Sequence, residues 1–178
     1  MKKVSLYLFA LLAIVTFGTS CEKEDPIAPE PPQNTLADAF VGKWIDGNVN
    51  PAQFSTYDGV RQDDMENTMA YHFQKDGTAE QYIYYFEESE NKQILTYRKG
   101  TVTFDAATKT LNFNPKEGWY RLFENETKVE EEDLSAEGLY PKYAPKYRDC
   151  TIEEYNGGTF LVGINNNNEN VDFAKFNW

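Results

Sequence analysis

The chain has 178 residues and carries 29 aspartates and glutamates against 17 lysines and arginines, a net charge of −12. Binding to nucleic acid depends on clustered basic residues. The sequence has no such cluster, so it predicts no nucleic-acid partner. One histidine and two cysteines, Cys21 and Cys150, are too few for a Cys/His zinc site.

The N-terminal residues 1–20 have the pattern of a secretory signal peptide. Lys2 and Lys3 precede an apolar run over residues 4–17, and Gly18-Thr19-Ser20 supplies the small residues of a cleavage site. The apolar run is too short for a membrane-spanning helix, which needs about 20 residues. We therefore expect residues 1–20 to be removed.

Cys21 directly follows these small residues, and this arrangement resembles the lipobox of bacterial lipoproteins. The resemblance implies that the Cys21 sulfur is acylated and that the acyl chains anchor the protein to a membrane. It also implies a place in the cell envelope, on the outer membrane, with surface exposure as one option. The alternatives are a conventional cleaved signal with an incidental cysteine and an uncleaved membrane anchor.

Residues 21–34 hold the acylated cysteine and a tether. The stretch 22–34 is acidic and contains four prolines, so it has almost nothing to bury and should be extended. The remaining residues 35–178 are long enough for one domain with a packed core. Because Cys21 is acylated, Cys150 has no cysteine partner in the chain, and the core must stabilise the domain without a disulfide.

Short alternating runs separated by turn residues predict an all-β domain. A helical turn over residues 36–40 leads into a first strand at 42–45, and residues 46–68 are interpreted as a loop with one helical turn. Asp76-Gly77 is the strongest hairpin signal. The later strands are expected at residues 69–73, 78–86, 93–104, 110–114, 119–123, 128–134, 147–155, 159–164 and 171–177.

Two details of this pattern can be tested directly. Gly100 predicts a β-bulge within its strand, and Pro115–Gly118 predicts a turn between two strands. No long helix is expected. We predict about nine or ten antiparallel strands in an up-and-down meander, closed into a β-barrel, with a β-sandwich as the alternative.

Residues 36–178 resemble the lipocalin-like domains of small bacterial lipoproteins. The helical turn runs into Gly42-Lys43-Trp44, which matches the Gly-x-Trp entry to the first lipocalin strand. Residues 73–78 match an F-x-x-D-G-T hairpin, and up-and-down strands follow. The resemblance implies a barrel closed at one end by Trp44 beneath a basic side chain, Lys175 or Arg148. It implies a central ligand cavity only where inward side chains leave space.

No catalytic arrangement is apparent, so the sequence predicts no enzyme, no metal site and no cofactor. His72 alternates with Tyr71 and Phe73, which predicts a surface histidine. The acidic run 130–133 predicts a solvated strand edge rather than paired glycosidase carboxylates. Two oxygen-rich groups lack the spacing of an EF-hand calcium loop: Asp58, Asp63, Asp64 and Glu66, and Asn165–Asn168 with Glu169 and Asp172.

Tyr82, Tyr84 and Phe86 share one face of a predicted strand, and Ile83 and Tyr85 share the other. If Ile83 and Tyr85 supply the core, the three rings form an accessible platform for a ligand. A strand buried on both faces is the alternative. Aromatic residues that could extend the platform are Trp119, Tyr120, Tyr140, Tyr143 and Tyr147.

Two functional hypotheses follow. The leading one is a monomeric, lipid-anchored and non-enzymatic module that binds a small apolar or glycan ligand at Tyr82, Tyr84 and Phe86. The alternative is an envelope protein–protein interaction module whose barrel is filled and which takes no small ligand.

Overall fold

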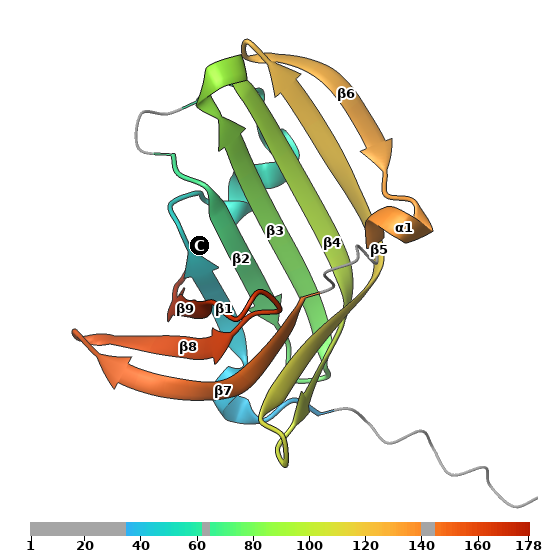
Figure 1. The fold of residues 1–178 in the computed structure, drawn as a ribbon. Coiled ribbons are helices and arrows are strands. Elements are labelled where there is room, and N and C mark those ends of the chain that lie inside the picture. Colours follow the sequence, from blue (N-terminus) through green and yellow to red (C-terminus); the bar gives the residue numbers. More distant parts are fainter. Residues whose placement is uncertain (1–34, 62–64, 140–144) are drawn as a thin grey trace, which may run out of the picture. The chain divides into compact units, whose positions relative to one another are not determined.

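The structure is a computed structural model that describes residues 35–61, 65–139 and 145–178. The predicted signal peptide, Cys21 and the tether all fall within residues 1–34, outside the described residues. The described residues form an antiparallel all-β fold with a few short helical turns (Figure 1). The predicted fold class is therefore confirmed.

The strands follow one another up and down along the described chain. They are β1 (Gly42–Asp46), β2 (Thr68–Phe73), β3 (Thr78–Glu87), β4 (Lys92–Asp105), β5 (Thr110–Glu124), β6 (Thr127–Asp133), β7 (Lys146–Tyr155), β8 (Gly158–Ile164) and β9 (Asn170–Lys175). The short helical turns are η1 (Asp38–Phe40), η2 (Pro51–Thr56), η3 (Glu88–Glu90) and α1 (Ala136–Leu139). The turn η2 lies in the segment that was predicted to be mainly a loop.

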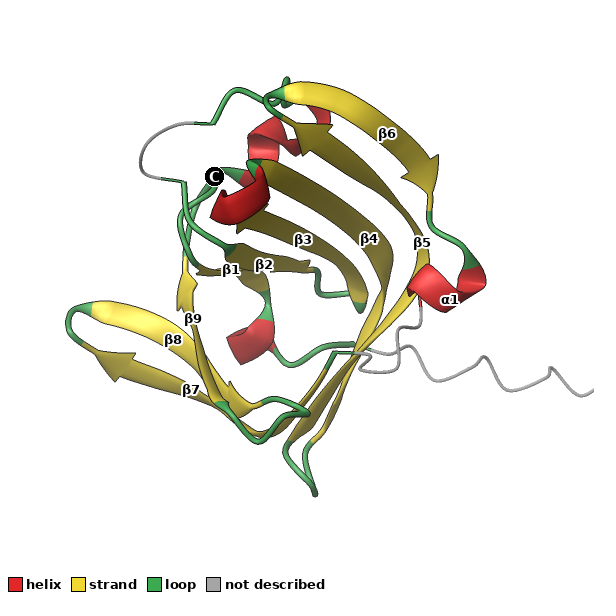
Figure 2. Ribbon diagram, turned by 45° about the horizontal axis from the view of Figure 1, so that its top comes forward, coloured by secondary structure: helices red, strands yellow, loops and turns green. Residues whose placement is uncertain are grey.

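Eight of these strands close into a ring in the order β4-β3-β2-β1-β9-β8-β7-β5, because β4 also pairs with β5. Figure 2 shows β7–β9 on one side of this ring and β2–β5 on the other. The ring closes through a short contact, in which Leu111 of β5 pairs with Tyr147 of β7. Backbone hydrogen bonds from Phe113 to Pro145, 3.1 Å, and from Cys150 to Lys109, 2.9 Å, reinforce it.

β5 departs from the sequence prediction. Residues 110–124 form one strand, so the predicted turn at Pro115–Gly118 was wrong. Gly100 pairs with Pro115 while Lys99 pairs with Glu117, which leaves Lys116 as the extra residue of a bulge. The bulge predicted at Gly100 is confirmed, and its cause is close approach: a Cβ at Gly100 would lie 2.0 Å from the carbonyl oxygen of Asn114.

Trp44 is fully buried, as predicted. Its indole Nε1 donates a 2.8 Å hydrogen bond to the carbonyl oxygen of Phe40, which ties η1 to β1. Lys175 Nζ lies 5.3 Å from the centre of the Trp44 ring, whereas Arg148 donates to the side chain of Asn168. Of the two basic candidates, Lys175 is therefore the one that lies over Trp44.

The strands differ greatly in length, and this produces two cores. β1 and β9 have 5 and 6 residues, whereas β4 and β5 have 14 and 15. The long strands therefore continue past the ring as an extension, formed by residues 82–97 and 119–133. The ring core consists of Leu36, Phe40, Trp44, Tyr71, Phe73, Ala79, Val102, Leu111, Phe113, Tyr147, Cys150, Leu161 and Phe173. The extension core consists of Val49, Phe54, Met65, Tyr84, Leu95 and Phe123.

Candidate functional site

The two faces of β3 have different surroundings. Ala79 belongs to the ring core, and Gln81 Nε2 donates a 2.6 Å hydrogen bond to the Tyr71 hydroxyl inside the ring. Alternation therefore places Tyr82, Tyr84 and Phe86 on the outer face. In the extension, residues 47–61 lie over this outer face, and we call them the cover segment. Its Phe54 and Tyr57 rings lie 5.3 Å from Tyr82 and 6.2 Å from Tyr84.

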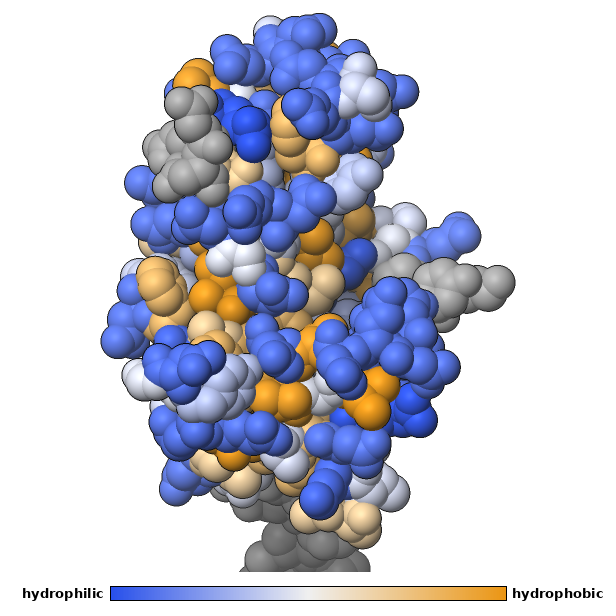
Figure 3. Space-filling view, turned by 60° about the vertical axis from the view of Figure 1, so that its left-hand side comes forward, coloured by the Kyte–Doolittle hydropathy of each residue, from blue (hydrophilic) through white to orange (hydrophobic). Residues whose placement is uncertain are grey.

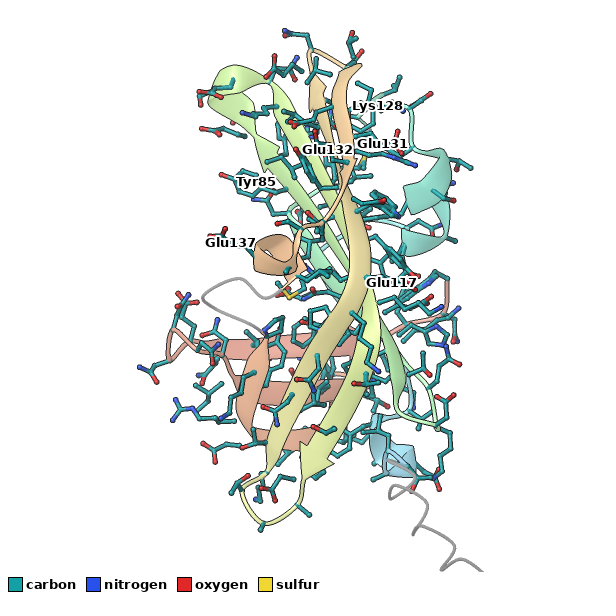
Figure 4. All side chains as sticks on the ribbon, turned by 90° about the vertical axis from the view of Figure 1, so that its right-hand side faces the viewer. Tyr85, Glu117, Lys128, Glu131, Glu132 and Glu137 are labelled. Atoms are coloured by element: carbon teal, nitrogen blue, oxygen red, sulfur yellow. The ribbon has the colours of Figure 1, made fainter. Side chains whose placement is uncertain are left out.

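Tyr84 is not on an accessible surface. Its side chain is 1% exposed, whereas Tyr85, from the row predicted to supply the core, is 45% exposed. The predicted assignment of the two faces was wrong here, because the cover segment makes the outer row of the extension its core. Figure 4 shows Tyr85 on the side of the sheet that carries Glu137, with Glu131 and Lys128 on the side of η2.

Phe86 is half-buried and already has a partner. The Arg61 guanidinium lies 4.3 Å from the centre of its ring, and the Phe86 amide donates a 2.7 Å hydrogen bond to Asn67 Oδ1. One face of this ring is thus covered by a cation from the cover segment. Of the three predicted ligand residues, Tyr82 is the one that continues into an open surface.

Tyr82 begins a row of rings that crosses three strands. It pairs with Tyr97 of β4, and Tyr97 pairs with Trp119 of β5. The ring centres are 5.3 Å apart for Tyr82 and Tyr97 and 5.7 Å apart for Tyr97 and Trp119, the latter pair stacked. All three side chains are half-buried. We call Tyr82, Tyr97 and Trp119 the aromatic row.

A charged row runs beside the aromatic row on the same outer face. Cross-strand pairing links His72 to Glu80, Glu80 to Lys99, and Lys99 to Glu117. Lys43 precedes His72 in the same register. Because neighbouring rows on one face are two residues apart along each strand, rings and charges lie next to each other.

Glu80 joins the two rows. Its carboxylate accepts hydrogen bonds of 3.0 Å from both the Tyr97 and Tyr82 hydroxyls, and His72 Nδ1 lies 3.3 Å away. Burial raises the pKa of Glu80, but the three hydrogen bonds outweigh it and hold the pKa below its usual value. Burial, and then the Glu80 charge, raise the pKa of Tyr82. Glu80 is therefore ionised and the tyrosine is a neutral donor at neutral pH.

A groove of about 370 Å³ lies against the aromatic row. Its floor contains Tyr82, Tyr97 and Trp119, and its wall is formed by Pro51, Ala52, Phe54 and Ser55 of the cover segment. The Arg121 guanidinium lies 4.4 Å from the centre of the Trp119 ring and adds a cation near one end of the row. The rings that line the groove therefore contact a cation, Arg121, and a carboxylate, Glu80, which lie beside it.

The C-terminal residues add aromatic side chains at the other end of the row. The Trp178 ring lies 6.2 Å from Tyr82 and 6.4 Å from Phe176. A second hollow, of about 530 Å³, is lined there by Trp178, Phe176 and Ile45 among others. On the side of the molecule that carries the C-terminus, Figure 3 shows hydrophobic residues gathered across the middle between hydrophilic ones.

The ring interior is filled by side chains. Trp44, Tyr71 and Phe73 are fully buried there with Phe113 and Phe173. The Tyr71 and Tyr147 hydroxyls are 2.8 Å apart, and Arg98 Nη1 donates a 3.0 Å hydrogen bond to Gln81 Oε1. These polar atoms of the interior therefore pair with one another between packed rings, whereas Arg98 Nε is buried without a hydrogen-bond partner among the described residues.

The other predicted candidates are widely dispersed. Trp119 joins the aromatic row and Tyr147 lies in the ring core, while Tyr140 and Tyr143 are outside the described residues. The acidic run 130–133 lies on β6, which pairs with β5 alone among the described strands. It is therefore a strand edge, as predicted.

Two absences can be stated of residues 35–61, 65–139 and 145–178. Within them, no three His, Cys, Asp or Glu side chains gather in a way that could hold a metal ion. The same part of the chain contains no helix with the length and apolar character needed to cross a bilayer.

Sequence reasoning missed Glu80 and Tyr97. A usable signal was present, because Tyr82 and Tyr97 lie at equal distances from the centre of the charged turn 87–92. A hairpin centred there places the two rings opposite each other, as observed. The position of Glu80 two residues before Tyr82 then follows from alternation.

Comparison of the chain with protein-family models, with curated proteins and with solved structures finds no match. The geometry of the outer face is therefore the feature that indicates a function.

Proposed function

We propose that the protein is a non-enzymatic, lipid-anchored binding module of the cell envelope that takes a glycan on the aromatic row. The observation that carries the proposal is the register of Tyr82, Tyr97 and Trp119 beside the charged row. Glu80 of the charged row accepts hydrogen bonds from the hydroxyls of two of these rings, Tyr82 and Tyr97. The proposed site therefore keeps Tyr82 and includes Tyr97 and Trp119 in place of Tyr84 and Phe86.

The chemistry of a sugar fits this surface. A pyranose presents an apolar C–H face that packs on aromatic rings, while its hydroxyls need hydrogen-bond partners. An ionised carboxylate has about four acceptor positions, and Tyr82, Tyr97 and His72 occupy three of those on Glu80. A sugar hydroxyl is a suitable donor for the remaining position.

Binding without chemistry is supported by the same groups. Glu80 is held as a carboxylate by tyrosine donors, which suits an acceptor and opposes a role as general acid. Glu117, the other carboxylate of the charged row, lies 3.7 Å from Lys99 Nζ. The sequence also carries no nucleophile motif such as Gly-x-Ser-x-Gly.

A glycan titration tests the proposal. Full-length protein in detergent is titrated with neutral oligosaccharides of glucose, mannose, galactose and N-acetylglucosamine, and binding is recorded by isothermal titration calorimetry, which does not depend on the tryptophans. Tyr97→Ala and Trp119→Ala should each weaken binding at least tenfold, because each removes a ring on which the C–H face of a sugar packs. Tyr85→Ala, on the opposite face of the sheet, is the matched control and should bind as the wild type does. Binding that survives both row variants would contradict the site.

The membrane anchor is tested separately. Cys21 should incorporate an alkyne-labelled fatty acid, and Cys21→Ala should release the protein from membranes because the acyl chains supply the attachment. Wild-type protein that takes up no label and fractionates without the membrane would contradict the anchor and leave the glycan proposal in place.

A protein–protein interaction module is the second candidate. The filled ring interior and the exposed ring of Tyr85 support it. A partner on that face would make Tyr85→Ala, and not Trp119→Ala, the variant that reduces capture of the partner.

A further inference from the structure

A third hollow is lined by Phe54 like the groove at the aromatic row, but it otherwise has a different lining. It measures about 500 Å³, within the range of small-molecule sites. We propose that it binds a small, uncharged molecule with an apolar body. This site is independent of the glycan proposal, since Tyr97 and Trp119 do not line it.

The floor of this pocket is apolar. Tyr84 and Leu95 come from β3 and β4, and Val49, Phe54 and Met65 are the other lining residues that belong to the floor. These five side chains are all members of the extension core and are each less than a tenth exposed. An apolar ligand would therefore extend a packed core that the cover segment closes only in part.

The two tyrosines of the lining, Tyr57 and Tyr84, belong to a neutral hydrogen-bond network centred on the buried Gln93. Gln93 Oε1 accepts hydrogen bonds from the Tyr57 hydroxyl and, at 3.0 Å, from the Tyr84 hydroxyl. Gln93 Nε2 donates a 2.8 Å hydrogen bond to the carbonyl oxygen of Gly59. Burial raises the pKa of both tyrosines, so each stays protonated at neutral pH.

Two charged side chains lie at or beside the pocket. Asp58 is the one charged side chain among the described residues that line it, and its Oδ1 accepts a hydrogen bond from the Val60 amide. Arg61 lies beside the lining, where its Nη2 donates a 2.8 Å hydrogen bond to the carbonyl oxygen of Met65. No lysine or arginine is among those lining residues, and the whole chain has a net charge of −12. The Arg61 guanidinium is engaged by the Met65 carbonyl oxygen and the Phe86 ring and does not line the pocket. A carboxylate or sulfonate would therefore enter without a cationic partner among the described lining residues, at a desolvation cost.

Hydrogen bonds from side chains of the sheet hold the cover segment, which forms the wall of the pocket, in place. Arg121 Nη1 donates to the carbonyl oxygens of Phe54, at 3.2 Å, and Ser55, at 2.9 Å. Together with the Gln93 contact to Gly59, these bonds fix both ends of the wall. A pocket with fixed walls loses little conformational entropy when a ligand binds.

The test uses a matched pair of fluorescent probes on the full-length protein in detergent. N-phenyl-1-naphthylamine is uncharged, and 1-anilinonaphthalene-8-sulfonate is similar in shape but anionic. We expect the amine to bind with a micromolar Kd and the sulfonate at least tenfold more weakly. Equal affinity for the two probes, or no saturable binding of the amine above a detergent-only blank, would overturn the proposal.

Two filling variants locate the site. Val49→Trp and Thr56→Trp place a large ring on two sides of the lining, and each should weaken amine binding at least tenfold. Thr56 is exposed, so its variant tests the site even if Val49→Trp disturbs folding. Ile83→Trp, on the opposite face of β3, and Trp119→Ala, in the aromatic row, should both leave the Kd within twofold. Unchanged binding in Thr56→Trp would overturn the proposal, whereas a loss in Trp119→Ala would place the probe in the aromatic groove instead.

Discussion

The ring and the extension solve the same packing problem in different ways. In the ring, eight strands curve round and their inward side chains fill the space that they enclose. In the extension, the sheet is open and its outer face is covered by a segment whose only regular element is the short turn η2. The ring supplies its own partners, whereas the extension depends on residues 47–61.

This difference explains the hollows on the two sides of Phe54. Inward side chains of a closed ring face one another across a fixed distance and can interlock fully. A segment with one short helical turn meets a sheet at a few points, such as Phe54, and leaves gaps on both sides of each contact. The two proposed sites therefore lie beside the cover segment, outside the packed ring core.

Trp44→Ala should produce the largest effect, because it removes a fully buried indole from the ring core. The expected loss in the free energy of unfolding is about 3–5 kcal/mol, the range for deleting a large buried aromatic side chain. The loss of the hydrogen bond to Phe40 adds to it. Urea unfolding followed by circular dichroism measures the change.

The matched control is Trp178→Ala, which removes an indole from the half-buried C-terminal residue. It should cost much less than Trp44→Ala. A loss below about 1 kcal/mol for Trp44→Ala would mean that the ring does not depend on its core, and the contrast with the extension would fail.

Tyr84→Ala should rank second and affects the extension. Its ring is buried beneath the cover segment, so we expect a loss of about 3 kcal/mol. Ile83→Ala, on the half-exposed face of the same strand, should cost about 1 kcal/mol. Thermal unfolding of the two variants compares them directly. The reverse ranking would show that the cover segment does not bury this face in solution.

Local sequence signals predicted most of the strands, and non-local contacts decided what was missed. Asp76-Gly77 and the alternation around it predicted the hairpin of β2 and β3, and Gly100 predicted the bulge between β4 and β5. Pro115 was read as a turn because a proline has no amide to donate, yet a bulge accommodates it. Both rows of β3 are rich in large side chains, so alternation alone could not reveal which one is buried. That depends on residues 47–61, which have no periodic pattern and lie far away in sequence.

Arg121→Ala should have a smaller effect, confined to the cover segment. The variant loses the hydrogen bonds to Phe54 and Ser55 and the contact with Glu131, 2.7 Å. We expect a loss of about 1–2 kcal/mol in the free energy of unfolding. Hydrogen exchange should show faster exchange in residues 51–60 with unchanged rates in β7–β9. Equal acceleration in β7–β9 would mean that ring and extension open as one unit.

Glu80→Gln should have the smallest effect, and its pH dependence identifies the cause. Burial raises the pKa of Glu80, but hydrogen bonds from Tyr97, Tyr82 and His72 bring it below the unfolded value of 4.5. A lowered folded pKa means that the carboxylate stabilises the fold above about pH 4.5 and that this contribution is lost as the pH falls through the folded pKa. Glu80→Gln should therefore cost about 1 kcal/mol at pH 7, and the difference from the wild type should shrink below pH 4.5. Glu117→Gln, on an exposed position of the same charged row, should cost less than about 0.5 kcal/mol. Urea unfolding at pH 7 and at several values below 4.5 measures both variants. A Glu80→Gln difference that stays constant with pH would show that the stabilisation by these donors does not depend on the charge of Glu80. That result would remove the ionised acceptor on which the glycan proposal relies.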